Sequence, residues 1–217
     1  MTSRSIGRCA SVAALVLPVL AACAGQGFSR VENPFFSSFY DRSAVDRAFR
    51  DTKMPVVIAR PLGGIEASTG EDVVLEALER GYPRQSAGFT RVAPPEGTVP
   101  DGYYLVVQPD GNVTNRPDAC TPRAIHMTDT GAPPPAAATA PSDIPHQIGL
   151  AICYGDSAVS VTQGSMVPET ANAAGYAPLF QALFHAMTPL RNPMLDNGCI
   201  GFCNDARLPS IPTGRLG

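Results

Sequence analysis

Cysteine is the residue type with the widest chemistry in this chain, because a thiol can be acylated, oxidised to a disulfide or bound to a metal. Four of the six cysteines lie after residue 100, namely Cys120, Cys153, Cys199 and Cys203. Four cysteines allow three pairings, and spacing alone does not choose among them. We favour Cys120–Cys153 together with Cys199–Cys203, since Gly201 permits the tight turn that so small a ring requires. The alternative is a zinc site, because Cys-x-x-x-Cys has a metal-like spacing, although no histidine lies nearby in sequence.

A serine nucleophile is a second candidate, in the block Tyr154-Gly155-Asp156-Ser157. These four residues resemble the Gly-Asp-Ser block of SGNH-type lipases and esterases. Enzymes of that kind also need an Asp-x-x-His near the C-terminus to activate the serine. The only late histidine, His185, follows Gln181-Ala182-Leu183-Phe184 instead. The residues after the block alternate like a strand, so Ser157 is predicted to be a polar turn residue, and we predict no catalytic residue.

The three histidines do not form a convincing site either. His185 is predicted to be solvated, because it lies opposite the apolar stripe of a helix, and His146 is predicted to be exposed at the start of a strand. His126 shares a proline-rich region with Cys120 and Asp129, which is a loose metal-like set that we do not favour. We therefore predict neither a metal nor a cofactor.

The N-terminal segment ends in Leu20-Ala21-Ala22-Cys23. Arg4 and Arg8 precede an uncharged run that is shorter than the ~20 apolar residues of a membrane-spanning helix but suits a signal peptide. Small residues before a cysteine resemble the lipobox of bacterial lipoproteins. The resemblance implies that residues 1–22 are removed and that Cys23 carries several acyl chains, palmitate among them. Several chains anchor a protein stably, whereas one binds only marginally.

Two other interpretations of this segment stay open: a plain secretory signal cleaved after small residues, and a segment retained as an anchor. Position 24 is Ala rather than the Asp that the lipoprotein sorting rule associates with the inner membrane. The resemblance therefore implies a lipid-anchored protein of the outer membrane that faces the periplasm. That compartment is oxidising, so disulfide bonds are expected there.

Charge and composition disfavour several classes of partner. Removing residues 1–22 takes away two of the 16 basic residues, which leaves 14 against 19 acidic residues and a net charge of −5. This balance argues against nucleic acid and against an anionic lipid surface as partners. Tryptophan is absent, which disfavours an aromatic platform for sugars. No small-molecule substrate is indicated.

The pattern of apolar residues divides the chain into four parts. We predict a signal peptide over 1–22, an anchor and tether with a short helix over 23–53, an α+β domain over 54–190 and an irregular tail over 191–217. A proline-rich loop over 109–146 interrupts the domain. The tether also carries an aromatic cluster that can pack on the domain or lie on a membrane, formed by Phe35, Phe36, Phe39 and Tyr40.

Strands are predicted where β-branched or alternating runs occur, over residues 54–60, 102–108, 147–153 and 158–164, with a brief edge strand at 89–92. In the third run Ile148, Leu150 and Ile152 share one face, whereas Gly149, Ala151 and Cys153 share the other.

Helices are predicted from capping boxes and apolar stripes. Ser43 with Asp46, and Thr69 with Asp72, have the form of capping boxes. The second box opens a helix through Arg80 that Gly81 stops. The last helix carries an apolar stripe, has Pro178 in its first turn and ends at Pro189. Its stripe consists of Tyr176, Leu179, Phe180, Leu183, Phe184 and Met187.

The predicted order is strand, helix, strand, strand, strand, helix, which favours a two-layer α+β sandwich with two helices on one face of a mostly antiparallel sheet. Several strands carry apolar or small residues on both faces. The face that the two helices do not cover must therefore meet the proline-rich loop, the tail or another protein.

A lipobox followed by this order of elements resembles small envelope lipoproteins of unknown function and assembly lipoproteins that dock onto outer-membrane machines. The likeness rests on the helix ending in Arg80-Gly81-Tyr82, the strand YYLVV and the hairpin QIGLAIC–AVSVTQG. It implies binding rather than catalysis and transfers no functional residue. We predict a non-enzymatic accessory or binding component of an envelope assembly, with an envelope protein as partner. The alternatives are a periplasmic enzyme with an unrecognised site and a thiol or metal protein built on Cys199 and Cys203.

Overall fold

The computed structural model describes residues 30–32, 34–60, 62, 67–109, 116–126, 145–168 and 170–196. Residues 1–22, predicted to be a signal peptide, lie outside the described residues, as do Cys23, Cys199, Cys203 and most of the predicted proline-rich loop. The elements are β1 (Arg30–Val31), β2 (Phe35–Phe36), α1 (Arg42–Asp51), β3 (Met54–Ile58), α2 (Ala67–Gly81), β4 (Phe89–Arg91), β5 (Tyr103–Pro109), the 3-10 turn η2 (Arg116–Asp118), α3 (Pro122–Ile125), β6 (His146–Tyr154), β7 (Ser157–Met166), α4 (Ala173–Met187) and α5 (Pro193–Asp196).

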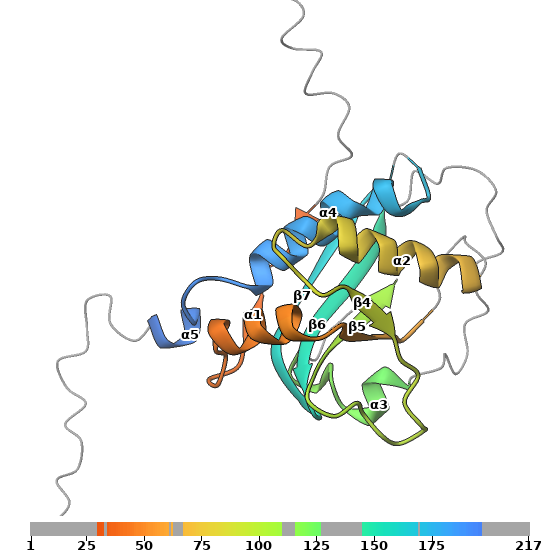
Figure 1. The fold of residues 1–217 in the computed structure, drawn as a ribbon. Helices are drawn as coiled ribbons and strands as arrows, with labels where there is room; N and C mark the ends of the chain where they lie inside the picture. Colours follow the sequence, from red (N-terminus) through yellow and green to blue (C-terminus); the bar gives the residue numbers. More distant parts are fainter. Residues whose placement is uncertain are drawn as a thin grey trace, which may run out of the picture.

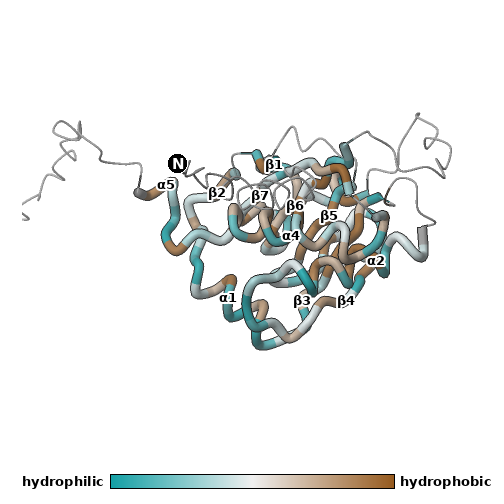
Figure 2. The backbone as a smooth tube through the Cα atoms, turned by 90° about the horizontal axis from the view of Figure 1, so that it is seen from above, coloured by the Kyte–Doolittle hydropathy of each residue, from teal (hydrophilic) through white to brown (hydrophobic). Residues whose placement is uncertain are grey.

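The fold is of the mixed α+β class with a mostly antiparallel seven-stranded sheet, as predicted at that level. The strand order is β1-β7-β6-β5-β3-β4, and β2 also pairs with β7. The β5–β6 and β6–β7 pairs are antiparallel, whereas β3 runs parallel to both β4 and β5. Apolar residues concentrate on β5 and β6 in the middle of the sheet (Figure 2).

Three helices cover one face of the sheet, whereas the sequence predicted two. Helices α2 and α4 lie side by side over the strands, and α1 lies beside them (Figure 1). The whole predicted stripe of α4 is buried, and Val45 and Phe49 of α1 are 0% exposed. Val74, Ala77 and Leu78 form the buried face of α2. Helix α1 is therefore a part of the core.

A glycine sets the distance between α2 and α4. Gly81 is the last residue of α2, and a Cβ atom placed there would lie 2.8 Å from the Ala177 carbonyl oxygen and 2.8 Å from the Phe180 Cβ. Any larger residue would therefore push the two helices apart. Sequence reasoning assigned Gly81 only to helix termination.

The predicted tether is, from Arg30 onward, part of the folded domain. β1 pairs with β7 at Arg30↔Ser165, and β2 pairs with it at Phe36↔Ser160. Of the aromatic cluster, Phe36 and Tyr40 are buried, whereas Phe39 stays exposed. The boundary at residue 54 thus separates two stretches that share one core.

Three predicted helix starts differ from the structure. α1 is capped by Asp41, whose carboxylate accepts hydrogen bonds from the Ser43 amide and hydroxyl at 2.8 Å and 2.7 Å, so Ser43 is not the cap. α2 begins at Ala67, two residues before Thr69. α4 is capped by Asn172, which places Pro178 in the second turn, where a proline removes one intrahelical hydrogen bond.

The opposite face of the sheet is closed by a shorter piece of chain. Ala119, Cys120 and Ile125, from the segment that carries η2 and α3, are buried on it. Apart from the large Tyr104, they pack against small and medium side chains of the strands, namely Val57, Val106, Ala151, Cys153, Ala158 and Val161. The alternation predicted for β6 is confirmed, because Ile148, Leu150 and Ile152 belong to the core on the helix-covered face.

Candidate functional site

Among the described residues, the large hydrophobic side chains that stay exposed are Phe39 (52%), Tyr154 (55%), Leu190 (87%), Met194 (58%) and Leu195 (66%). They come from three segments: the loop before α1, the end of β6, and the stretch from α4 through α5. We call these residues the apolar end. A single exposed hydrophobic residue is ordinary, but a gathered group marks an interaction surface.

The side chain of Asn192 joins two of these segments. Its Nδ2 donates to the carbonyl oxygens of Ser37 at 2.9 Å and Ser38 at 3.4 Å, next to Phe39. Its Oδ1 accepts from the amide of Met194 at 3.0 Å and so caps the short helix α5. Asn192 is buried, so the contact is shielded from water. The bonds fix the exposed side chains of α5 beside the loop that carries Phe39.

The carbonyl of Pro189 receives a second set of bonds from the same loop. The Tyr40 hydroxyl donates to it at 2.9 Å, and Nη1 of Arg42 donates at 3.1 Å. Arg42 Nε also pairs with Asp46 at 2.8 Å, so the guanidinium is held by two partners. Burial of the ring raises the pKa of Tyr40 to about 12, and its hydroxyl remains a donor at neutral pH. Leu190, which follows Pro189, is therefore displayed on a fixed backbone.

The third segment is the turn between β6 and β7. Gly155 has φ 57°, a left-handed conformation that favours glycine, and the turn leaves Tyr154 exposed. The Tyr154 ring packs edge-on against Tyr103 with centroids 5.0 Å apart. Burial raises the pKa of Tyr103, and the charges of Asp41 and Tyr154 add to the shift.

Two exposed carboxylates border the apolar end. Hydrogen bonds from the Ser43 hydroxyl, the Ser43 amide and the Ala44 amide lower the pKa of Asp41, which keeps it ionised. Asp156 is exposed in the β6–β7 turn, where it accepts a hydrogen bond from the Ser157 hydroxyl at 3.2 Å. Arg191 is an exposed cation beside Leu190. Exposed charges of both signs therefore lie in the same segments of the chain as the exposed apolar side chains.

The structure pairs Cys120 with Cys153, across a sequence separation of 33 and with Cα atoms 5.7 Å apart. Both residues are fully buried. The Tyr104 hydroxyl donates to the Cys120 carbonyl at 3.0 Å and lies 2.8 Å from the Gly155 carbonyl. The disulfide and Tyr104 together hold the η2–α3 segment on the sheet. The pairing of Cys199 with Cys203 falls outside the described residues.

The other sequence candidates do not come together. Ser157 begins β7 and donates to Asp156, so it occupies the predicted polar turn. His185 is exposed, as predicted. His146 is half-buried rather than exposed, because its Nδ1 lies 3.1 Å from the Tyr176 hydroxyl. His126 Nε2 lies 3.1 Å from the Thr98 carbonyl oxygen.

The described residues contain neither a cluster of metal ligands nor a membrane-spanning helix. No group of three or more His, Cys, Asp or Glu side chains there is placed to hold a metal ion. None of the helices in the described ranges is long and apolar enough to cross a membrane.

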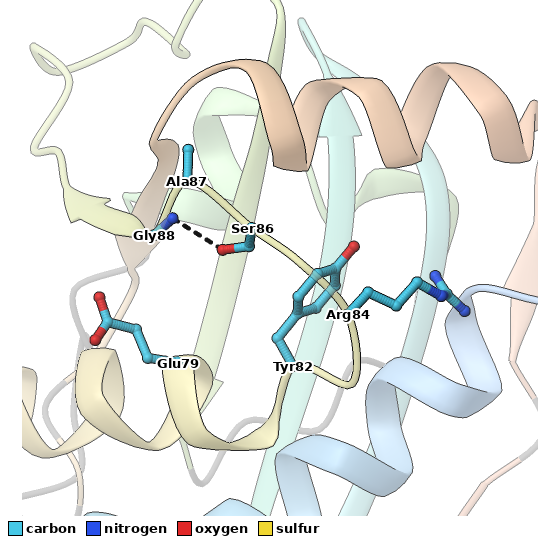
Figure 3. A pocket seen from close by; sticks show the side chains of 6 residues that line it. All are labelled: Glu79, Tyr82, Arg84, Ser86, Ala87 and Gly88. Atoms are coloured by element: carbon cyan, nitrogen blue, oxygen red, sulfur yellow. Dashed lines mark hydrogen bonds between the residues drawn. The ribbon is translucent and has the colours of Figure 1, made fainter.

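An open depression of about 330 Å³ lies between the end of α2 and the loop before β4 (Figure 3). Its polar groups do not converge. Glu79 and Arg84 point to different sides, and Ser86 Oγ accepts from the Gly88 amide at 2.9 Å. Arg84 is already paired with Asp46 at 3.0 Å. We therefore take the apolar end, rather than this depression, as the candidate site.

Comparison with known proteins gives little further information. No family model and no curated protein matches the chain. Among solved structures, the chain is similar to the PelC dodecamer of Paraburkholderia phytofirmans, with 9% identity, a TM-score of 0.37, and coverage of 76% of this chain and 100% of that one. A likeness at that level carries no argument about this protein.

Sequence reasoning missed most of the apolar end. Phe39 was noted only as part of an aromatic cluster, and the residues from Leu190 to Leu195 were assigned to the end of the domain and an irregular tail. The available signal was the presence of Leu190, Met194 and Leu195 among polar residues and prolines after the end of the last amphipathic helix, where they form no helical stripe of their own.

Proposed function

We propose that this chain is a lipid-anchored lipoprotein of the bacterial outer membrane, that it faces the periplasm, and that it acts without catalysis as a binding component of an envelope assembly. The observation that carries the binding role is the apolar end. The backbone that carries Phe39 and Leu190 to Leu195 is fixed by a buried hydrogen bond from Asn192 and a part-buried one from Tyr40, whereas an incidental exposed tail has no such support.

Two further observations support the location. The disulfide between Cys120 and Cys153 is fully buried, which suits a protein that folds in an oxidising compartment. The lipobox cysteine, Cys23, lies seven residues before β1, the first strand described. The domain would therefore be held close to the membrane that carries its anchor.

We also infer that α1, α2 and α4 with the sheet make the two-layer sandwich of the proposal. The η2–α3 segment would then be a small additional cover on the far face. In this arrangement the two faces are occupied by the chain itself, which leaves an end of the sheet as the free surface.

The anchor is tested by expressing the full chain in a Gram-negative host and comparing it with a Cys23→Ser variant. We expect the full chain in the outer-membrane fraction, with mass spectrometry showing a triacylated N-terminal Cys23. The Cys23→Ser variant should leave that fraction. A soluble mature protein that begins at any other residue would contradict the proposal.

The binding role is tested on a double variant, Phe39→Ser with Leu195→Ser. Both side chains are exposed, so we expect thermal unfolding to stay unchanged. On native gels of mildly solubilised membranes, the parent chain should migrate in an assembly larger than the monomer and the variant should not. Unchanged migration of the variant would remove the apolar end from the proposal.

A further inference from the structure

The methionines of this chain differ sharply in their exposure to water. The structure describes four of the six, namely Met54, Met166, Met187 and Met194. The first three belong to the core cluster on the helix-covered face and are 1%, 4% and 0% exposed. Met194 is 58% exposed. Among the described methionines, Met194 is therefore the one that a reagent dissolved in water reaches in the folded chain.

The backbone holds Met194 in this exposed position. Its amide donates to Oδ1 of Asn192 at 3.0 Å, and Nδ2 of Asn192 donates to the Ser37 carbonyl at 2.9 Å. Asn192 is buried. Moving Met194 into the interior would break these bonds and leave buried polar groups without partners, which is unfavourable. The Met194 side chain therefore stays at the surface while the domain is folded.

Met194 also lies within the surface to which we assign binding. Leu190 before it and Leu195 after it are 87% and 66% exposed, and all three belong to the apolar end. Met194 is absent from both buried clusters of the domain. A chemical change at Met194 thus alters the apolar end and leaves the core contacts in place.

We propose that Met194 is an oxidation site, and that its conversion to the sulfoxide by hydrogen peroxide weakens binding at the apolar end. The inference rests on the proposed function, because the surface that loses its partner is the one assigned there. It adds regulation to that surface. The proposed location outside the cytosol is an oxidising one, where such a change persists until a reductase reverses it.

The reaction is the transfer of one oxygen atom. A lone pair of the Met194 sulfur attacks one peroxide oxygen, so that an S–O bond forms and the O–O bond breaks. The second oxygen leaves as water with both protons of the peroxide. The sulfur loses two electrons and the peroxide gains them. A reductase that uses a dithiol returns the thioether, releases the oxygen as water and leaves the dithiol as a disulfide.

The sulfoxide is a poor contact for an apolar partner surface. Oxidation replaces a soft apolar group by a strongly polar one. Burial of that group in an apolar contact removes its water without supplying a hydrogen bond. We expect the affinity to fall about tenfold, which corresponds to about 1.4 kcal/mol.

The first experiment tests the oxidation site on the purified full chain with its disulfide intact. The chain is treated with hydrogen peroxide, and peptide mass spectrometry follows the sulfoxide at each methionine. Met194 should be oxidised at least about tenfold faster than the three buried methionines. In urea the four rates should become similar, because burial is lost. Equal rates in the folded chain, or a faster reaction at a buried methionine, would overturn the site.

The second experiment tests the effect on binding. Mildly solubilised membranes are treated with enough peroxide to oxidise Met194 fully, and the chain is analysed on native gels. The parent chain should leave its assembly, and methionine sulfoxide reductase with dithiothreitol should restore it. Met194→Leu carries no thioether there, so its migration should be the same before and after peroxide. Met127→Leu makes the same replacement at a methionine outside the described residues and should stay sensitive.

Each chain is compared with itself before and after peroxide, so oxidation of the partner is separated from oxidation of Met194. Met194→Gln places an uncharged polar side chain of similar length at the same position and should weaken the assembly without peroxide. If Met194→Leu itself removes the assembly, the Met194→Gln chain and the reversal by the reductase decide the question.

Three outcomes overturn the inference: a parent assembly that survives full oxidation of Met194, a loss that is equal in Met194→Leu, and a Met194→Gln chain that migrates as the parent does. A parent chain that forms no assembly before peroxide contradicts the proposed function itself. The peptide mapping needs no partner, so failure of the oxidation site is distinguished from failure of the proposed function.

Discussion

The two faces of the sheet are closed by different physical means. On the helix-covered face, large side chains pack against one another: Phe49 stacks on Tyr82 with ring centroids 4.5 Å apart, and Phe184 meets Tyr82 edge-on at 5.0 Å. On the other face, Tyr104 is the one large strand side chain of the buried cluster, and the rest are small or medium; they meet a short segment that is held by the disulfide between Cys120 and Cys153.

Side-chain size explains this difference. Burial of apolar surface contributes roughly 25 cal/mol per Å², so a face of phenylalanine, leucine and methionine side chains can hold its helices by burial alone. Ala151 and Ala158 on the opposite face bury much less area, and the helix on that side, α3, has only 4 residues. The disulfide therefore supplies stability on that face that burial of apolar surface does not.

The largest expected effect comes from breaking the aromatic cluster. Phe184→Ala should lower the free energy of unfolding by about 3–5 kcal/mol, because it leaves a cavity among Phe49, Tyr82 and Phe89. Urea unfolding with the disulfide intact measures the change. Leu190→Ala, at a position that is 87% exposed, is the control and should cost less than about 0.5 kcal/mol.

Removing the disulfide should lower the free energy of unfolding by nearly as much, but it should loosen only the face that the η2–α3 segment covers. Cys120→Ala with Cys153→Ala should lower the free energy of unfolding by about 3–4 kcal/mol in the chain-entropy model, since the bond closes a long loop. Amide hydrogen exchange should accelerate most in residues 116–126 and least in α2 and α4. Equal acceleration in the helices would show that the two faces are not closed independently.

Tyr104→Phe tests the hydrogen bonds that assist the disulfide. The change should cost about 1–3 kcal/mol, because the buried carbonyl of Cys120 loses its donor. Thermal unfolding of the oxidised protein is the measurement, and Tyr103→Phe on the neighbouring position is the control. If the Tyr104→Phe variant is as stable as the parent chain, the hydrogen bond from Tyr104 does not help the disulfide to hold the η2–α3 segment.

The smallest expected effect on stability is a loss that appears only at alkaline pH. It concerns Tyr40 and Tyr82 on the helix-covered face. Burial raises the pKa of Tyr40 and of Tyr82 to about 12, above the value near 10 of an unfolded chain. Their stabilising contribution is complete below pH ~10 and is lost as the pH rises towards about 12. Unfolding measured across this range should show the loss, and Tyr82→Phe should reduce it. A parent and variant with the same pH profile would contradict this assignment.

The parts of the fold that the sequence predicted are those with a long repeating pattern. The stripe from Tyr176 to Met187 and the alternation in β6 extend over enough residues to distinguish one face from the other. β1 and β2 have 2 residues each, which is too short for any alternation to appear. They are strands because their backbones pair with β7.

Helix starts and the candidate site depend on contacts that no local pattern contains. Asp41 and Ser43 are both good capping residues, and the choice between them is made by the backbone conformation at Asp41. The exposed residues Leu190 and Leu195 would pass for core residues by type alone. Their exposure follows from Asn192, whose bonds to the β2–α1 loop hold the chain across the end of the sheet.

The pairing of β1 and β2 with β7 has a consequence for the order of events during synthesis. The first strands of the domain find their hydrogen-bonding partners about 130 residues later, at Ser160 to Ser165. A ribosome makes roughly 5–20 residues per second, so synthesis of β7 follows that of these strands by about 6 to 26 seconds. Contacts of such high sequence separation also slow folding. The chain therefore stays unfinished until nearly all of it has been made, and closure of the sheet is a late step.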